Sequence, residues 1–134
     1  MIEKITHEGR VFAMILRNDS RPEETEFFTP QEFPLQLGFL KYQSDTVVKP
    51  HTHKPFNNAV NKRQEVLLIQ NGKVEATFYT CKGEKISSNV LNRGDILFLA
   101  EGGHGFKILE DAEIIEVKQG PYEGVIKDKK DLDL

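Results

Sequence analysis

Short apolar runs separated by turn residues dominate this chain. They are rich in Val, Ile, Leu and Phe, and helical periodicity is weak almost everywhere. The pattern predicts strands at Val11–Leu16, Leu35–Tyr42, Asp45–Val48 with a continuation through His53, Glu65–Gln70, Lys73–Tyr79, Val90–Leu91, Ile96–Ala100, Gly105–Leu109 and Ala112–Lys118. Many short strands with turns between them are typical of a sandwich or barrel, so an all-β fold is expected.

The segments between these runs also carry structural signals. Asn71-Gly72 is the preferred residue pair for a tight type I′ hairpin, so a turn is predicted there. The polar region Asp19–Pro34 contains two adjacent phenylalanines and is expected to wrap the surface. The charged tail Lys127–Leu134 is expected to be a solvated end. Because no repeat or long linker interrupts the chain, residues 1–134 are interpreted as a single domain.

Composition narrows the class of protein. Of 134 residues, 38% are hydrophobic and 29% are charged, which is too apolar for a disordered chain and too polar for a membrane protein. A net charge of −3 argues against broad binding to nucleic acids or anionic membranes. The N-terminus lacks the apolar core of a signal peptide, and the one cysteine, Cys81, cannot form an internal disulfide. These features favour a cytoplasmic protein.

Three of the four histidines lie where they could bind a metal. His51 and His53 are separated by one residue, so on an extended strand both side chains project from the same face. Glu65 shares its face with Leu67 and Ile69, and a carboxylate on such a core-facing row must be neutralised, paired or bound to a metal. His104 follows two glycines that allow a tight turn, which could aim its ring inward.

These residues resemble the two motifs of the cupin superfamily. The first motif has the form His-x-His, a gap, then Glu, six residues and Gly, which His51, His53, Glu65 and Gly72 match. The second begins with Gly and ends in His, as Gly94 and His104 do. The resemblance implies a jelly roll, the cupin double-stranded β-helix, with core motifs at about residues 47–118. It also implies one divalent metal ion bound by His51, His53, Glu65 and His104.

The chain departs from the cupin pattern at several positions. Eleven residues separate His53 from Glu65, which is longer than the usual gap, although loop length costs little free energy. The second motif is one residue short, and Ala100 stands in the usual place of Pro. Simpler interpretations also exist, in which the two neighbouring histidines are exposed strand residues, Glu65 pairs with a Lys or Arg from the next strand, and His104 is a hydrogen-bonded turn residue.

The long gap carries its own chemistry. Between Thr46 and Gln64 there are four basic residues and no acid, namely Lys49, Lys54, Lys62 and Arg63. This local positive charge could steer an anionic ligand towards the proposed metal, or it could simply keep a surface loop soluble. Phe56 could close over such a ligand or anchor the loop. Lys54, Phe56, Lys62 and Arg63 are therefore the candidate ligand contacts.

Three imidazoles and one carboxylate suit Fe, Mn, Ni, Co or Zn. On an octahedral ion they leave two positions open for chemistry, whereas on tetrahedral zinc they would close the site. The favoured hypothesis is an enzyme of isomerase, epimerase or dioxygenase type that acts on a small polar or anionic metabolite. The ending Ile114–Tyr122 resembles small bacterial cupins associated with polysaccharide biosynthesis, which suggests a carbohydrate or sugar nucleotide. The alternatives are a non-catalytic module that binds a metabolite or a metal, and a purely structural protein with a closed metal site.

A homodimer is also expected. Cupins commonly dimerise, and a sandwich with open sheet edges has reason to pair them. The segment near Val11 is the predicted partner strand between chains.

Overall fold

The computed structural model describes residues 2–55, 62–120, 130–132 and 134, and over these residues the protein consists of strands and loops. Its strands are β1 (Ile2–His7), β2 (Arg10–Leu16), β3 (Glu26–Phe27), β4 (Gly38–Phe39), β5 (Glu65–Tyr79), β6 (Lys85–Asn92), β7 (Ile96–Leu99) and β8 (Gly103–Lys118). The all-β prediction is confirmed. Among the described residues there is no helix long and apolar enough to span a membrane.

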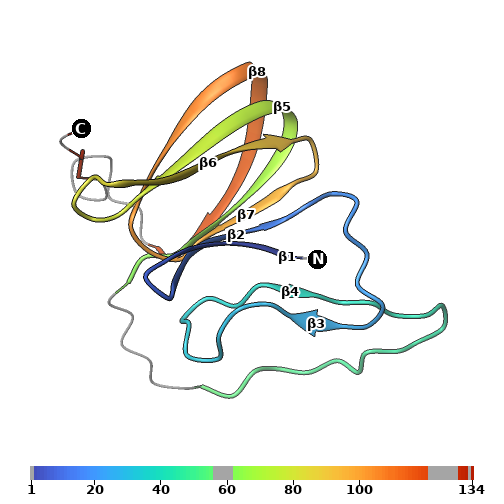
Figure 1. Cartoon of the computed structure of the whole chain (residues 1–134). Coiled ribbons are helices and arrows are strands. Elements are labelled where there is room, and N and C mark those ends of the chain that lie inside the picture. Colours follow the sequence, from blue (N-terminus) through green and yellow to red (C-terminus); the bar gives the residue numbers. More distant parts are fainter. Residues whose placement is uncertain (1, 56–61, 121–129, 133) are drawn as a thin grey trace.

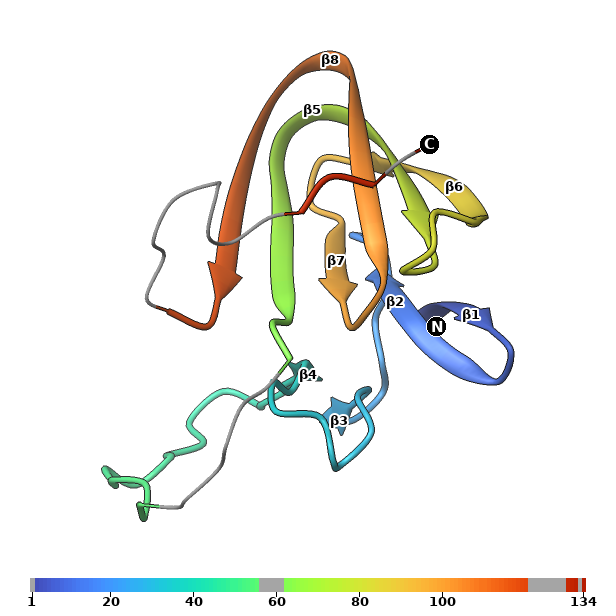
Figure 2. The same cartoon turned by 90° about the vertical axis from the view of Figure 1, so that its left-hand side faces the viewer.

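Six strands form one antiparallel sheet that curls into a half-barrel (Figure 1). The strand order is β1-β2-β7-β5-β6, and β8 pairs with β5 outside this path. Strands β5 and β8 are 15 and 16 residues long, and they arch together over the open side of the sheet (Figure 2). The first part of β5 pairs with β7 and the last part pairs with β6, so the bend in β5 and β8 makes the sheet curl.

The hairpin predicted at Asn71-Gly72 is wrong, because β5 continues through both residues as one bent strand. The ladder between β5 and β8 shifts register around Asn71 and Lys73, as at a β-bulge. Gly72 has φ +90°, and a Cβ placed there would overlap the carbonyl oxygen of Asp111 on β8. The glycine therefore allows a bend between two closely packed long strands. Because β8 pairs with β5 on both sides of this bend, it is one strand where the sequence predicted two, Gly105–Leu109 and Ala112–Lys118.

The tight hairpin of the sheet joins β1 to β2 instead. His7 pairs with Arg10, which leaves Glu8 and Gly9 as the two turn residues. Both have positive φ, 50° and 76°, as a type I′ turn requires. Strand β1 itself was not predicted, and it occupies the edge of the sheet beside β2. Since β2 lies between β1 and β7, the edge of the sheet on this side is β1 and not the segment near Val11.

Apolar residues pack on both sides of β2 and β7. Inside the curl is a core of Ile5, Ala13, Ile15, Leu67, Ile69, Val74, Ala76, Phe78, Leu91, Leu97 and Leu99. The outer face is covered by the segment that contains the β3-β4 pair. There Phe28 and Leu37 pack with Met14 and Phe98, and the rings of Phe33 and Phe98 stack with centroids 6.0 Å apart. The expectation that the region around Phe28 wraps the surface is thus confirmed.

A buried carboxylate ties the β6–β7 turn to β2. Asp95, which is 3% exposed, accepts hydrogen bonds from the backbone N–H of Asn18 and Asn92 and from Nη1 of Arg17. Arg17 also binds the Glu3 carboxylate on β1. Hydrogen bonding to Glu3 in the first place, and then to Asp95, raises the pKa of Arg17 against the opposing effect of burial. The guanidinium therefore stays charged, and the network is structural.

Strands predicted over Leu35–Tyr42 and Asp45–His53 are largely wrong. Only Gly38–Phe39 is a strand, and residues 40–55 have no regular secondary structure and are exposed throughout. The β-branched run Thr46–Val48 has strand propensity, but propensity stabilises a strand only when a neighbour supplies hydrogen bonds. In this structure the segment projects past the β3-β4 pair, on the opposite side from the arch of β8 (Figures 1 and 2).

Candidate functional site

Glu65 is the first residue of β5 and lies at the centre of the candidate site. In the ladders it pairs with Leu99 of β7 on one side and with Lys118 of β8 on the other. It is 9% exposed, and the inward row that follows it contains Leu67 and Ile69, at 5% and 1%. The predicted core-facing position of this carboxylate is confirmed.

Two cationic or titratable side chains approach the Glu65 carboxylate from β8. Nζ of Lys118 is 3.6 Å from Oε1, and Nε2 of His104 is 3.6 Å from Oε2. The side chains of Glu65 and Lys118 are 11% and 13% exposed, and that of His104 is 32% exposed. The charged pair is thus largely withdrawn from water, and the imidazole lies on the more open side. A buried carboxylate in this setting must have such partners, because an unpaired charge is expensive to bury.

The curl of β8 brings these two partners together. His104 stands opposite Phe78, near the end of β5, whereas Lys118 stands opposite Glu65 at its start. Since β5 and β8 arch together, both ends of β8 lie at the open end of the arch, on either side of β5 (Figure 2), and the His104 and Lys118 side chains both reach the Glu65 carboxylate. The Phe106 ring lies 5.5 Å from the His104 ring and borders the site on the strand.

Buried amides extend the polar centre beyond the carboxylate. The backbone N–H of Gln64 donates to Oε1 of Gln119 at 2.9 Å. The side chain of Gln64 links the outer segment to the sheet, since it accepts from the N–H of Leu35 and donates to the carbonyl of Ala100. Nε2 of Gln119 is buried and has no hydrogen-bond acceptor within the described structure. Gln119 directly follows Lys118, the ladder partner of Glu65. A ligand with a hydrogen-bond acceptor at this place would satisfy the buried donor of Gln119.

His51 and His53 lie near each other, but in the exposed segment of residues 40–55. Their ring centroids are 5.2 Å apart, and Nδ1 of His51 is 2.7 Å from the carbonyl oxygen of Lys49. The sequence thus predicted their mutual proximity, although the strand expected to produce it does not form. Among the residues that the structure describes, no three His, Cys, Asp or Glu side chains are close enough to hold one metal ion. The four proposed ligands occur as two pairs, His51 with His53 and Glu65 with His104.

The candidate ligand contacts are distributed differently. Lys54, Lys62 and Arg63 are exposed, as expected for a charged surface segment. Phe56 lies outside the described residues. Lys62 and Arg63 lead directly into the buried pair Gln64 and Glu65, so positive charge lies beside the entry to β5.

Lys118 is the site residue that sequence analysis did not single out. Pairing of Glu65 with a basic residue on a neighbouring strand was one of the open interpretations, and Lys118 is that residue. A signal was present in the alternation of Ala112, Ile114, Glu116 and Lys118, which share one face of a strand. That face is the inner one, since Ala112 and Ile114 pack against the core inside the curl. Choosing Lys118 requires the register between β5 and β8, which local sequence does not contain.

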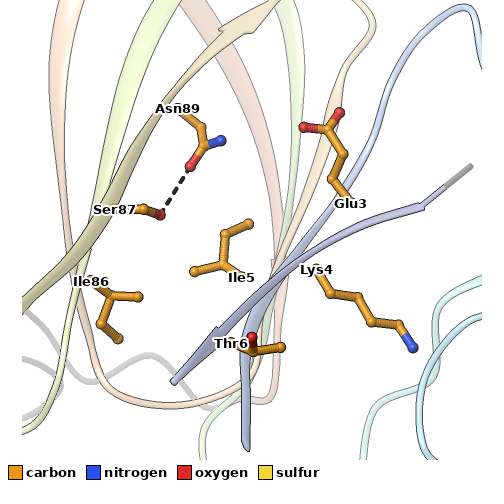
Figure 3. A pocket seen from close by; sticks show the side chains of 7 residues that line it. All are labelled: Glu3, Lys4, Ile5, Thr6, Ile86, Ser87 and Asn89. Atoms are coloured by element: carbon orange, nitrogen blue, oxygen red, sulfur yellow. Dashed lines mark hydrogen bonds between the residues drawn. The ribbon is translucent and has the colours of Figure 1, made fainter. Parts of the chain in front are cut away.

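A hollow with a volume of about 500 Å³ lies between the edge strands β1 and β6, apart from the Glu65 site (Figure 3). It is lined by Glu3, Lys4, Ile5, Thr6, Ile86, Ser87 and Asn89. The Ser87 hydroxyl donates to Oδ1 of Asn89 at 3.2 Å, and Glu3 is already bound to Arg17. The hollow therefore offers hydroxyl and amide groups but no free acid–base pair.

Comparison with known proteins adds no relative: no family model matches the sequence, and neither a curated protein nor a solved structure matches it. The cupin resemblance accordingly depends on the motif residues of this chain. The structure bears out the coarser statement, an all-β antiparallel half-barrel.

Proposed function

We propose that the protein is a metal-binding cupin that acts on a small polar or anionic metabolite, and that Glu65 and His104 form the fixed half of its metal site. The observation that carries this proposal is the placement of a buried carboxylate and an imidazole from opposite ends of the β5–β8 pairing within 3.6 Å of each other. Carboxylate oxygen and imidazole nitrogen are compatible donors for a divalent transition metal. Arrangements of buried titratable groups of this kind are more common at functional sites than elsewhere.

His51 and His53 are proposed as the other two ligands. Their rings already lie side by side, and imidazole pairs at this spacing are common metal ligands. The metal would act as a Lewis acid on a substrate carbonyl or would bind dioxygen, which are the isomerase or epimerase and the dioxygenase alternatives. Lys118 and the exposed Lys54, Lys62 and Arg63 would favour an anionic substrate, such as a sugar nucleotide, through their positive charge.

The second candidate function is a non-catalytic module that binds a metabolite, and the Lys118 contact favours it. Lys118 already neutralises Glu65 without a metal, and His104 adds a second nitrogen group beside the carboxylate. Such a protein would bind its ligand through Lys118, His104 and the unsatisfied amide of Gln119. The two candidates differ in whether a metal is part of the site.

Metal analysis of the purified protein decides between them. The wild type, prepared without chelator, is compared with Glu65→Gln, with His104→Ala and with the double variant His51→Ala, His53→Ala. His7→Ala is the matched control, because His7 lies on β1 near Glu8 and Glu84 and away from the site. About one equivalent of Fe, Mn, Ni, Co or Zn in the wild type and in the control, lost in all three site variants, supports the metal site. Absence of metal from the wild type after reconstitution overturns it in favour of the non-catalytic module.

A further inference from the structure

Within the described part of the chain, one edge of strand β8 has no partner strand. Of its two edges, one pairs with β5 along nearly the whole strand, and no other described strand pairs with the second. The strand is 16 residues long, and four of its apolar side chains are 41% to 55% exposed: Ile108, Leu109, Ile115 and Val117. Natural proteins rarely leave an edge that is both long and apolar uncovered, because it recruits other strands.

A second exposed element, held at its start by hydrogen bonds between Lys41 and Thr25, has the matching properties. Residues 40–55, here called the arm, are all exposed and form no strand. The arm nevertheless contains four large apolar residues that are 55% to 79% exposed, namely Leu40, Tyr42, Val47 and Val48. Its 16 residues, fully extended, reach about 50 Å, which is enough to follow β8 along its length.

The charges of the two elements are opposite. Strand β8 carries the four acids Glu110, Asp111, Glu113 and Glu116 against two lysines. The arm carries Lys41, Lys49 and Lys54 against the single acid Asp45. Opposite charges on two facing strands stabilise their pairing, whereas like charges destabilise it. The arm therefore suits the edge of β8 in propensity, exposed apolar surface and charge.

We propose that the arm of one chain adds as a strand to the free edge of β8 in a second copy. The second copy is favoured over the arm's own chain because the arm projects away from its own β8, on the far side of the β3-β4 pair (Figures 1 and 2). Reciprocal exchange of two arms satisfies both edges and gives a closed symmetric dimer. Backbone hydrogen bonds supply the affinity in this kind of strand addition, and the side chains supply its specificity.

The exchange also has a consequence for the site, which rests on the proposed function. The arm carries His51 and His53, whereas β8 carries His104 and Lys118 and lies beside Glu65. An arm paired with β8 of the other copy therefore brings its two imidazoles to the strand that holds the other ligands. Each metal site would then contain residues of both chains.

Disulfide trapping tests the contact without any metal. In a Cys81→Ser background, which removes the exposed native thiol, Val47→Cys or Val48→Cys is made in one chain. Ile108→Cys, Ile115→Cys or Val117→Cys is made in a second, tagged chain, so that several registers are sampled. Chains are mixed, oxidised mildly and separated under non-reducing conditions. Val90→Cys, on β6 and 38% exposed, is the matched control for random collision.

The expected result is a crosslinked heterodimer, for at least one arm–β8 combination, at a yield several-fold above that of the Val90→Cys control. Yields equal to the control overturn the proposal. An internal disulfide in a chain that carries both cysteines, formed at high dilution without crosslinked dimer, also overturns it and assigns the arm to its own β8. Sedimentation of the wild type is the second measurement, and a monomeric mass at all concentrations overturns the exchange.

The metal site has a separate readout. Chains with His51→Ala and His53→Ala are co-refolded with chains carrying Glu65→Gln and His104→Ala, and metal content is measured. Neither variant alone should bind metal, whereas the mixed dimer has one intact site if arms are exchanged. Trapped dimers without metal recovery would preserve the exchange and reject the shared site, so the two proposals fail independently.

Discussion

Glu65 and Lys118 stand directly opposite each other at one end of the β5–β8 ladder, with Nζ of Lys118 3.6 Å from Oε1 of Glu65. Both side chains are nearly 90% withdrawn from solvent, so this is an interior ion pair rather than a surface one. The same pair of residues therefore holds β5 to β8 and forms part of the proposed site.

Removing the lysine from this pair should be costly. Lys118→Met removes the cation 3.6 Å from the largely buried carboxylate of Glu65, and we expect it to lower the free energy of unfolding by about 3 kcal/mol. Glu65→Gln combined with Lys118→Met should cost less than the two single changes together, because no buried charge is then left alone. Urea denaturation of the three variants measures this coupling. Lys73→Met is the matched control, since the Lys73–Glu110 pair has the same 3.6 Å separation but is exposed, and it should cost less than about 0.5 kcal/mol.

The bend in β5 should depend on glycine. A methyl group added at Gly72 would overlap the backbone of β8, and alanine would have to adopt the φ of +90° that glycine has there. Gly72→Ala should therefore destabilise the protein by about 3 kcal/mol. Gly105→Ala on β8 is the control, because a Cβ there has nothing within 4 Å. It should be neutral or stabilising by about 0.5 kcal/mol through reduced freedom of the unfolded chain. Equal losses in thermal unfolding would contradict the packing described for Gly72.

The β1–β2 hairpin should be improvable. Glu8 has φ 50°, a conformation that asparagine adopts more readily than glutamate. Glu8→Asn creates the Asn-Gly pair preferred in type I′ turns and should stabilise the protein by about 0.5 kcal/mol. Gly9→Ala should destabilise it by about 1 kcal/mol, because φ there is 76°. The difference in melting temperature between the two variants is the measurement, and the opposite order would exclude this turn type.

The stability of the β6–β7 turn should be sensitive to substitution of its carboxylate, Asp95. Asp95→Ala leaves the backbone donors of Asn18 and Asn92 without this acceptor and removes one of the acceptors of Arg17, so a loss of about 3 kcal/mol is expected. Asp95→Asn keeps part of the hydrogen bonding and should cost less. Asp19→Ala, at an exposed position, is the control and should change stability by less than about 0.5 kcal/mol. Denaturant midpoints of the three variants make the comparison.

Alternation along the chain predicted the interior strands well. Val11–Leu16 and Ile96–Ala100 coincide closely with β2 and β7, whose apolar residues pack on both faces. It predicted the face of Glu65 for the same reason, since the neighbouring positions Leu67 and Ile69 are buried. These features follow from burial periodicity, which a local sequence carries.

The errors arise where distant strands override local signals. Asn71-Gly72 reads locally as a hairpin, but pairing of β5 with β8 on one side and with β6 and β7 on the other keeps the chain extended. Thr46–Val48 has strand propensity and lacks a partner strand in the described structure. Lys118 reaches Glu65 only through a register set by the whole β5–β8 ladder. The sequence thus predicted Glu65 and His104 as site residues, but it did not identify Lys118 as the partner of Glu65.

The arch of β5 and β8 also has a kinetic consequence. At one end of their ladder Tyr79 meets Gly103, 24 residues away, whereas at the other end Glu65 meets Lys118, 53 residues away. Closing the longer loop first costs more entropy, so the two strands should zip from the Tyr79 end towards the Glu65 end. Substitutions near Phe78 should then slow refolding, whereas Lys118→Met should mainly accelerate unfolding. The Glu65–Lys118 pair of the candidate site would accordingly be the last part of the β5–β8 ladder to assemble and the first to open.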